Sequence, residues 1–206
     1  MKYETKGAES VDKTFSHKLN TIKWVGIVTM TIDHIGYFLL PELLLLRIIG
    51  RVAFPCFLYS TIEGTKRTHH YGRYILRLVL LGILSMPVTP NTVNVLFLLA
   101  LFSLSLKFKK YALIFSLLSI FAEYSIYGFL FGWSIYWLKE HNWPQGTGLA
   151  VMTQYFVGLS IQIFSLLALP LFIIDKGLEL PKLPRYFFYA YYPLHQLVLI
   201  LIVSSL

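Results

Sequence analysis

Six ionisable side chains stand inside stretches of the sequence that are otherwise apolar. They are Asp33, His34, Arg47, Arg51, Glu123 and His195. An ionisable group is expensive inside a membrane, so each of these positions predicts either chemistry or the pairing of two helices. An imidazole can accept a proton near neutral pH, which makes His34 the preferred candidate for a general base. A guanidinium can stabilise negative charge that develops during a reaction.

Helical spacing places these groups at similar depths. Asp33 stands eight residues before the first turn, and Arg51 stands eight residues into the returning helix, so both lie about 12 Å from one membrane face. His195 lies about 13 Å inside the last apolar stretch by the same rule. Arg47 shares a helix face with Arg51. Neighbouring residues point about 100° apart, so we expect Asp33 to pair with Arg51 rather than with His34.

Simpler interpretations of the same residues stay open. The ionisable groups could pair only to hold helices together, without chemistry. A metal site is not expected, because no second histidine follows His34 at the spacing of one helical turn. Cys56 is the single cysteine and lies in an apolar run, so we expect a small buried side chain rather than a reactive thiol.

The composition requires a membrane around these residues. Of 206 residues, 56% are hydrophobic, 17% are aromatic and 14% are charged, with a mean hydropathy of +0.64. Soluble proteins carry about 25% charged residues. The shortage excludes a soluble enzyme, a disordered chain and a nucleic-acid-binding domain. It predicts an all-α, polytopic integral membrane protein.

The apolar stretches divide into about eight candidate transmembrane helices, bounded by Pro, Gly or basic residues. They cover residues 22–40, 43–62, 74–88, 92–106, 111–124, 127–138, 149–174 and 186–203. Residues 1–20 form an N-terminal arm, and residues 21–206 form a single transmembrane domain. Residues 111–138 allow two interpretations: two short helices that meet at residues 122–125, or one tilted helix of about 42 Å, which would reduce the count to seven.

Lys and Arg residues near the ends of the spans predict the orientation. With eight helices, one side receives five cations from the arm, four from residues 64–77, three from residues 107–110, and Lys139; the other side receives three, from residues 176–185. With seven helices the bias is stronger still. The positive-inside rule places the N-terminus in the cytoplasm and the protein in the cytoplasmic membrane. The basic turn at residues 64–77 is either an orientation signal alone or an anion site as well.

Four stretches together resemble the TraX family, the F-pilin acetylase-like integral-membrane acyltransferases of bacteria. They are Ile22-Lys23-Trp24-Val25 through Met30-Thr31-Ile32-Asp33-His34-Ile35-Gly36; Leu46-Arg47-Ile48-Ile49-Gly50-Arg51-Val52-Ala53-Phe54-Pro55-Cys56-Phe57, continuing to Ile62-Glu63-Gly64-Thr65 and Tyr74-Ile75-Leu76-Arg77-Leu78; Ala122-Glu123-Tyr124-Ser125-Ile126-Tyr127-Gly128; and Phe187-Phe188-Tyr189-Ala190-Tyr191-Tyr192-Pro193-Leu194-His195. They occur in the family's order and span most of the chain. The third stretch departs from the family, which usually has Asp-Tyr-Gly where this chain has Glu123-Tyr124-Ser125.

The resemblance implies an enzyme that moves an acetyl or longer acyl group from cytosolic acyl-CoA to an amine or hydroxyl at or beyond the membrane. The implied co-substrate is acetyl-CoA or another acyl-CoA, and the implied acceptor is a peptide, a sugar or a lipid headgroup. His34 would be the base, with Asp33 beside it, and a transient acyl-histidine stays open. Arg47 or His195 would polarise the carbonyl, Arg51 would support Asp33, and Glu123 and Asn94 would belong to the same oxyanion or supporting group. The CoA phosphates would bind Lys66, Arg67, Arg73 and Arg77.

Two other functions would use the same residues. A small proton-coupled transporter also needs carboxylates and histidines inside the membrane. A structural or assembly partner for another membrane protein would tolerate substitution at Asp33, His34 and Arg51. Membrane lipids are expected around the protein with any of these functions. The basic turn at residues 64–77 favours the acyltransferase, because a transporter has no use for a phosphate site there.

Overall fold

The computed structural model describes residues 2–88, 93–156, 160–174, 177–182 and 184–205, with side chains from Phe15 onward except at positions 185, 186, 188 and 189. Throughout these ranges the chain forms helices and connecting turns. The β-type contact recorded there is an isolated bridge between Val93 and Ala122. The all-α prediction is therefore confirmed for the described part of the chain.

The helices follow one another closely because the apolar sequence leaves few residues for loops. In chain order they are α1 (Lys2–Phe38), α2 (Leu44–Gly50), α3 (Ala53–Arg67), α4 (Tyr71–Ser85), η1 (Met86–Val88), α5 (Val95–Lys107), η2 (Lys109–Tyr111), α6 (Ala112–Leu118), η3 (Ser119–Phe121), α7 (Ser125–Lys139), α8 (Trp143–Phe156), η4 (Ile161–Ala168), α9 (Leu169–Ile173) and α10 (Arg185–Ser205), where η marks a 3₁₀ helix. Residues 2–20, expected to form an arm, continue the helix of the first predicted span.

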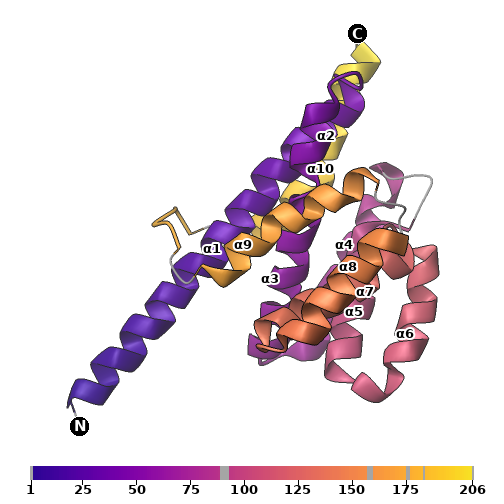
Figure 1. Ribbon diagram of the computed structural model, residues 1–206. Coiled ribbons are helices and arrows are strands. Elements are labelled where there is room, and N and C mark those ends of the chain that lie inside the picture. Colours follow the sequence, from indigo (N-terminus) through magenta and orange to yellow (C-terminus); the bar gives the residue numbers. More distant parts are fainter. Residues whose placement is uncertain (1, 89–92, 157–159, 175–176, 183, 206) are drawn as a thin grey trace.

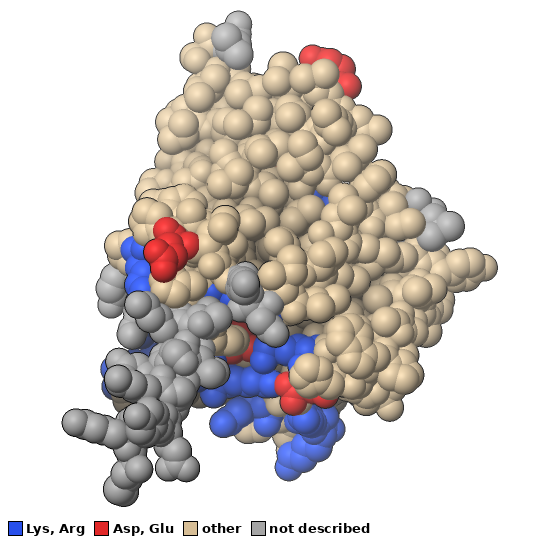
Figure 2. All heavy atoms as spheres, turned by 60° about the vertical axis from the view of Figure 1, so that its left-hand side comes forward, with Lys and Arg blue, Asp and Glu red and all other residues tan. Residues whose placement is uncertain are grey.

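Successive helices run back and forth between two ends of the molecule (Figure 1). One end gathers the turns at residues 66–73, 107–111 and 139–143, and we call it the basic end. Lys66 pairs there with Glu140, and its ammonium nitrogen lies 5.1 Å from the ring centroid of Tyr136. On the visible face Lys and Arg gather at this end, and most of the surface above them is uncharged (Figure 2). We call the opposite end, which contains the loop at residues 39–43, the distal end.

Residues 111–138 form two helical segments, so the single tilted helix is wrong and the two-helix alternative is confirmed. The chain turns at residues 122–125, where Tyr124 and Ser125 have φ of 64° and 48°. Both values lie in the left-handed region, which residues other than glycine rarely adopt. The turn is therefore held in place by its surroundings rather than by local preference.

Neighbouring helices supply that support. The amide of Glu123 donates to the carbonyl of Val93 at 2.7 Å. The ring of Tyr124 stacks on Phe54 of α3, with 4.0 Å between centroids. A broken helix is tolerated at membrane depth when protein satisfies its free backbone groups in this way.

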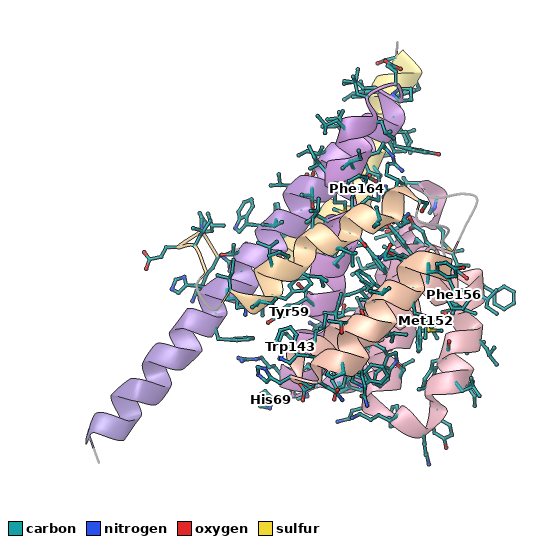
Figure 3. The ribbon with its side chains drawn as sticks, in the orientation of Figure 1. Tyr59, His69, Trp143, Met152, Phe156 and Phe164 are labelled. Atoms are coloured by element: carbon teal, nitrogen blue, oxygen red, sulfur yellow. The ribbon has the colours of Figure 1, made fainter. Side chains whose placement is uncertain are left out.

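Residues 149–174, predicted as one span, form two helical segments that run in opposite directions, so that prediction is wrong. Trp143 lies at the end of α8 nearer the basic end and Phe156 lies at its other end, while Phe164 lies on the segment after the break, nearer the distal end (Figure 3). Residues 157–159 lie outside the described part of the chain. Two observations explain why the break was missed.

The first is that the helix after the break begins at a weak signal, a serine cap. The hydroxyl of Ser160 accepts the amide hydrogen of Gln162 at 3.3 Å. The second is that the two segments are joined by an uncharged contact: the amide of Gln154 donates to Ser165 at 3.1 Å, and both side chains are buried. Neither the serine cap nor the Gln154–Ser165 contact involves a charged residue, so the hydropathy pattern of residues 149–174 is that of one continuous span.

Two helical runs among the described residues are long and apolar enough to cross a membrane, Leu44–Arg67 and Tyr71–Val88. Shorter apolar helices cover Val95–Lys107, Ile161–Ile173 and Ala190–Ser205. A helix of 13 residues is about 20 Å long, which is less than the hydrocarbon thickness of about 30 Å. The count of eight spans therefore stays a prediction.

Residues 177–182 lie along α1 and determine where α10 begins. The amide of Leu178 donates to the hydroxyl of Thr21 at 2.8 Å. The indole of Trp24 donates to the carbonyl of Pro181 at 2.9 Å. The start of α10 therefore lies beside the part of α1 that is nearer the basic end, and the two helices run parallel toward the distal end (Figure 1).

We expect Ser125→Gly to stabilise the protein by about 0.5–1 kcal/mol, because glycine adopts positive φ without the cost that other residues bear there. Thermal unfolding in detergent measures the effect. Ser116→Gly is the matched control: Ser116 lies inside α6, where glycine should destabilise by about 0.5–1 kcal/mol. A lower melting temperature for Ser125→Gly would show that this turn stores no strain at Ser125.

Candidate functional site

Asp33 lies between two arginines on the next helices. Its Oδ2 accepts a hydrogen bond from Nη1 of Arg47 at 2.7 Å, and its Oδ1 accepts one from Nη2 of Arg51 at 2.5 Å. The side chain of Asp33 is 13% exposed and that of Arg51 is 7% exposed. Arg51 also donates through Nε to the carbonyl of Arg47 at 3.1 Å. The structure thus contains the expected Asp33–Arg51 pair and adds Arg47 to it.

Gly50 allows α2 to approach α1 closely enough for these bonds. A Cβ atom at Gly50 would lie 2.2 Å from Oδ1 of Asp33. No side chain fits at that distance. The pairing of Asp33 with Arg47 and Arg51, which we call the clamp on Asp33, therefore requires glycine here. The helix also ends at Gly50, and Arg51 forms its C-terminal cap before α3 begins.

A second carboxyl group lies near the cluster. Glu123 interacts electrostatically with Arg51, as does Asp33. Glu123 also accepts a hydrogen bond from the amide of Val95 at 3.2 Å, at the N-terminus of α5, where negative charge is favoured.

Asn94 has a structural position at the same helix start. It is fully buried and is the N-cap of α5, where its Oδ1 accepts from the amide of Leu96 at 3.2 Å. Its Nδ2 donates to the carbonyl of Gly82 at 2.7 Å, which joins α5 to α4. Both ends of this side chain are therefore bonded to backbone, and neither faces the histidines described next.

His34 and His195 bond directly to each other across α1 and α10. Nδ1 of His34 lies 2.7 Å from Nε2 of His195. On its other side, Nδ1 of His195 lies 2.7 Å from the backbone carbonyl of Tyr191. No group of three or more His, Cys, Asp or Glu side chains able to hold a metal occurs among the described residues.

The hydrogen-bond partners determine which nitrogen of each neutral ring carries hydrogen. A carbonyl only accepts, so His195 carries its hydrogen on Nδ1 and offers the lone pair of Nε2 to His34. His34 then carries its hydrogen on Nδ1, which leaves its Nε2 as the free proton acceptor. The amide nitrogen of Gln196 is 3.5 Å from this Nε2, too far for a strong hydrogen bond. The arrangement makes Nε2 of His34 the basic atom of the site.

A cavity of about 470 Å³ lies between α1, α3, α4, α5 and α10. Its lining is cationic toward the basic end, where His69 lies (Figure 3), and largely apolar deeper inside. The side chains that are positive or can become so are Lys23, Arg67, His69, His70 and Arg77. Neither Asp nor Glu occurs among the described residues that line it. The cavity is suited to an anion attached to an uncharged arm.

The cavity ends close to the histidine pair. Met30 of α1 and Tyr191 of α10 both line it. His34 and His195 each follow four residues later on these parallel helices, about 6 Å further toward the distal end. A molecule that fills the cavity therefore ends about one helical turn from the basic nitrogen.

The four cations expected to bind phosphates divide into two groups. Arg67 and Arg77 line the cavity, whereas Lys66 and Arg73 do not. Lys66 donates to Glu140, and this bond holds the pKa of that carboxyl below its ordinary value. Arg73 is exposed at the surface of the basic end.

Most residues that line the cavity were not assigned to the site from the sequence. Among them are Lys23, His69, His70, Tyr191 and Tyr192. The two tyrosines belong to a stretch that carries the family resemblance, but nothing in their spacing links them to His69 or Lys23. Only the packing of three distant segments brings these side chains to one cavity.

Comparison with known proteins gives one family and two relatives. The model of the family described as TraX protein matches residues 18–203. The probable fimbrial assembly protein FimC, serogroup H1, of Dichelobacter nodosus is 25% identical over 225 residues, covering 84% of this chain and 91% of that protein. The uncharacterized protein RP591 of Rickettsia prowazekii (strain Madrid E) is 53% identical over 38 residues, which are 18% of this chain and 15% of that protein. No solved structure matches.

We expect Asp33→Asn to destabilise the protein by about 3–5 kcal/mol, because it leaves the buried guanidinium of Arg51 without its counter-charge. The double variant Asp33→Asn with Arg51→Gln should regain part of that loss, since it removes the orphaned charge. Thermal unfolding in detergent gives the comparison. Glu140→Gln is the control: it breaks the exposed pair with Lys66 and should cost less than about 1 kcal/mol. Equal losses at Asp33 and Glu140 would contradict this account.

Proposed function

Because the chain belongs to the TraX family, we propose that it is an integral-membrane acyltransferase that takes an acetyl or longer acyl group from acyl-CoA. The acceptor is an amine or hydroxyl at or beyond the membrane. The relative from Dichelobacter nodosus carries the name of a probable fimbrial assembly protein. That name favours a peptide group of a fimbrial subunit over a sugar or a lipid headgroup as the acceptor.

The observation that carries the proposal is the cavity and its position. An acyl-CoA combines several phosphates, which need cations, with a long uncharged arm that ends in the thioester. The cavity offers Arg67, Arg77 and Lys23 toward the basic end and apolar side chains deeper inside. It ends about one helical turn from His34. The basic end then faces the cytoplasm, as the distribution of Lys and Arg also predicts.

His34 acts as the general base in this proposal. The acceptor amine or hydroxyl attacks the thioester carbon while Nε2 of His34 takes its proton. The carbon–sulfur bond then breaks, and the protonated imidazole returns the proton to the departing thiolate of CoA. No electron is gained or lost. The hydrogen bond to His195 holds the ring with Nε2 free, because its Nδ1 hydrogen is already donated.

Asp33, Arg47 and Arg51 position this base rather than react. All three are engaged with one another, and Arg47 also lies over the ring of Tyr37, 5.1 Å from its centroid. Asp33 precedes His34 on α1, so the clamp on Asp33 fixes the rotation and depth of the helix that carries the base. Movement of α1 would displace Nε2 from the end of the cavity.

We expect His34→Gln to lower the transfer of labelled acetyl from acetyl-CoA by about 100-fold or more, because general-base catalysis contributes factors of that size. Purified protein in lipid vesicles, with a peptide amine as acceptor, gives the measurement. Binding of CoA should persist in the variant, and its retained stabilisation against heat shows that the variant is folded. Transfer at the wild-type rate would overturn the role of His34.

We expect Arg67→Gln and Arg77→Gln each to weaken CoA binding about 10–100-fold, since a hydrogen bond to a charged group contributes about 1.5–3 kcal/mol. Lys110→Gln is the control, because Lys110 is exposed at the basic end and does not line the cavity. Calorimetry with CoA measures all three. Wild-type protein that neither binds CoA nor transfers acetyl, but moves protons with a solute, would support the transporter instead.

A further inference from the structure

Acyl transfer requires a hydrogen-bond donor for the oxygen that becomes negative, and that donor must reach the cavity. Arg47 and Arg51 both donate to Asp33, and neither lines the cavity. His195 was also a sequence-based candidate for this role. Its Nδ1 hydrogen is donated to the carbonyl of Tyr191, and its Nε2 faces His34. The donor must therefore come from another side chain.

Tyr191 joins the cavity to the histidine pair. It lines the cavity, and its backbone carbonyl accepts from His195. Its ring stacks on His195, with 4.9 Å between centroids and 7° between the planes. It stands one helical turn nearer the basic end than His195, where the end of a bound acyl arm would lie.

The hydroxyl of Tyr191 donates its hydrogen to Thr31, a partner that a substrate oxygen can replace. Its oxygen lies 2.6 Å from Oγ1 of Thr31. Thr31 also lies 2.8 Å from the carbonyl of Ile27, and it must donate its single hydroxyl hydrogen there because a carbonyl only accepts. Tyr191 is therefore the donor in the bond to Thr31. Rotation about one C–O bond redirects that hydrogen.

We infer that the hydroxyl of Tyr191 is the donor that stabilises the oxyanion of acyl transfer. This inference rests on the proposed function. The acceptor attacks the thioester carbon, its proton passes to Nε2 of His34, and the carbonyl oxygen becomes negative and accepts the hydrogen bond of Tyr191. When the carbon–sulfur bond breaks, the carbonyl re-forms, the imidazole returns the proton to sulfur, and Tyr191 keeps its own hydrogen throughout.

Tyr191→Phe tests the inference with the full-length protein in lipid vesicles and acetyl-CoA as donor. Removing one oxyanion donor lowers kcat by about 10²–10³-fold. We expect that loss, with KM and the Kd of CoA changed less than about threefold, because the ring stays in place beside His195. A KM that rises while kcat is unchanged would overturn the inference, since it would make Tyr191 a binding residue.

Thr31→Val separates catalysis from structure, because it removes the same hydrogen bond but leaves the tyrosine hydroxyl. We expect its kcat to stay within about threefold of the wild type. If Thr31→Val loses as much as Tyr191→Phe, the hydroxyl only holds α10 against α1 and the inference fails. Tyr155→Phe, at an exposed position on α8, controls for the loss of any tyrosine hydroxyl.

A more acidic phenol provides an independent readout. Replacing Tyr191 with 3-fluorotyrosine by codon suppression keeps the shape and strengthens the donor, so kcat should exceed that of Tyr191→Phe by at least about tenfold. Equal rates for the two would count against the hydroxyl. A wild-type protein without any acetyl transfer would instead contradict the proposed function itself, which keeps the two failures distinct.

Discussion

The carboxylate of Asp33, whose side chain is 13% exposed, is the constraint on which the rest of the structure depends. In apolar surroundings this charge needs cations at contact distance, and Arg47 and Arg51 provide them from the helix that follows. Their approach is possible only because Gly50 has no side chain. Glu123 interacts electrostatically with Arg51 from the turn between η3 and α7. The neutralisation of Asp33 thus positions α1 and α2 relative to each other.

The parallel packing of α1 and α10 places the pair of His34 and His195 next to this cluster. Residues 177–182 lie along α1 and set the register in which α10 begins. That register brings Tyr191 to Thr31 and His195 to His34, one helical turn apart. The same two helices line the cavity on the side of the histidines that faces the basic end. One packing arrangement therefore provides both the binding space and the basic nitrogen at its end, and a shift of one residue along either helix would separate them.

Patterns of charge and hydropathy carried the predictions that hold. Asp33 and Arg51 could be paired from the sequence because helical rise and the cost of isolated charge leave few alternatives, whereas the second bond, from Arg47, was not predicted. The turn at residues 122–125 was one of two interpretations, and packing of Tyr124 against Phe54 decides between them. The break within residues 149–174 escaped prediction, because a serine cap and the Gln154–Ser165 contact leave no mark in an apolar run. Lys66 was assigned to phosphate from its place in a basic turn, whereas the structure pairs it with Glu140.

The amino-acid sequence by itself determined that this is a helical membrane protein, that a few ionisable groups stand inside it, and that it resembles one family. These properties depend on composition and on spacing along a single helix. Both are local, so they can be recognised from the amino-acid sequence. Only the tertiary structure decided which nitrogen of His34 is free, which cations line the cavity, and that Tyr191 lies between cavity and histidines. Each of these depends on the relative register and rotation of helices far apart in the sequence, which many small packing contacts determine together.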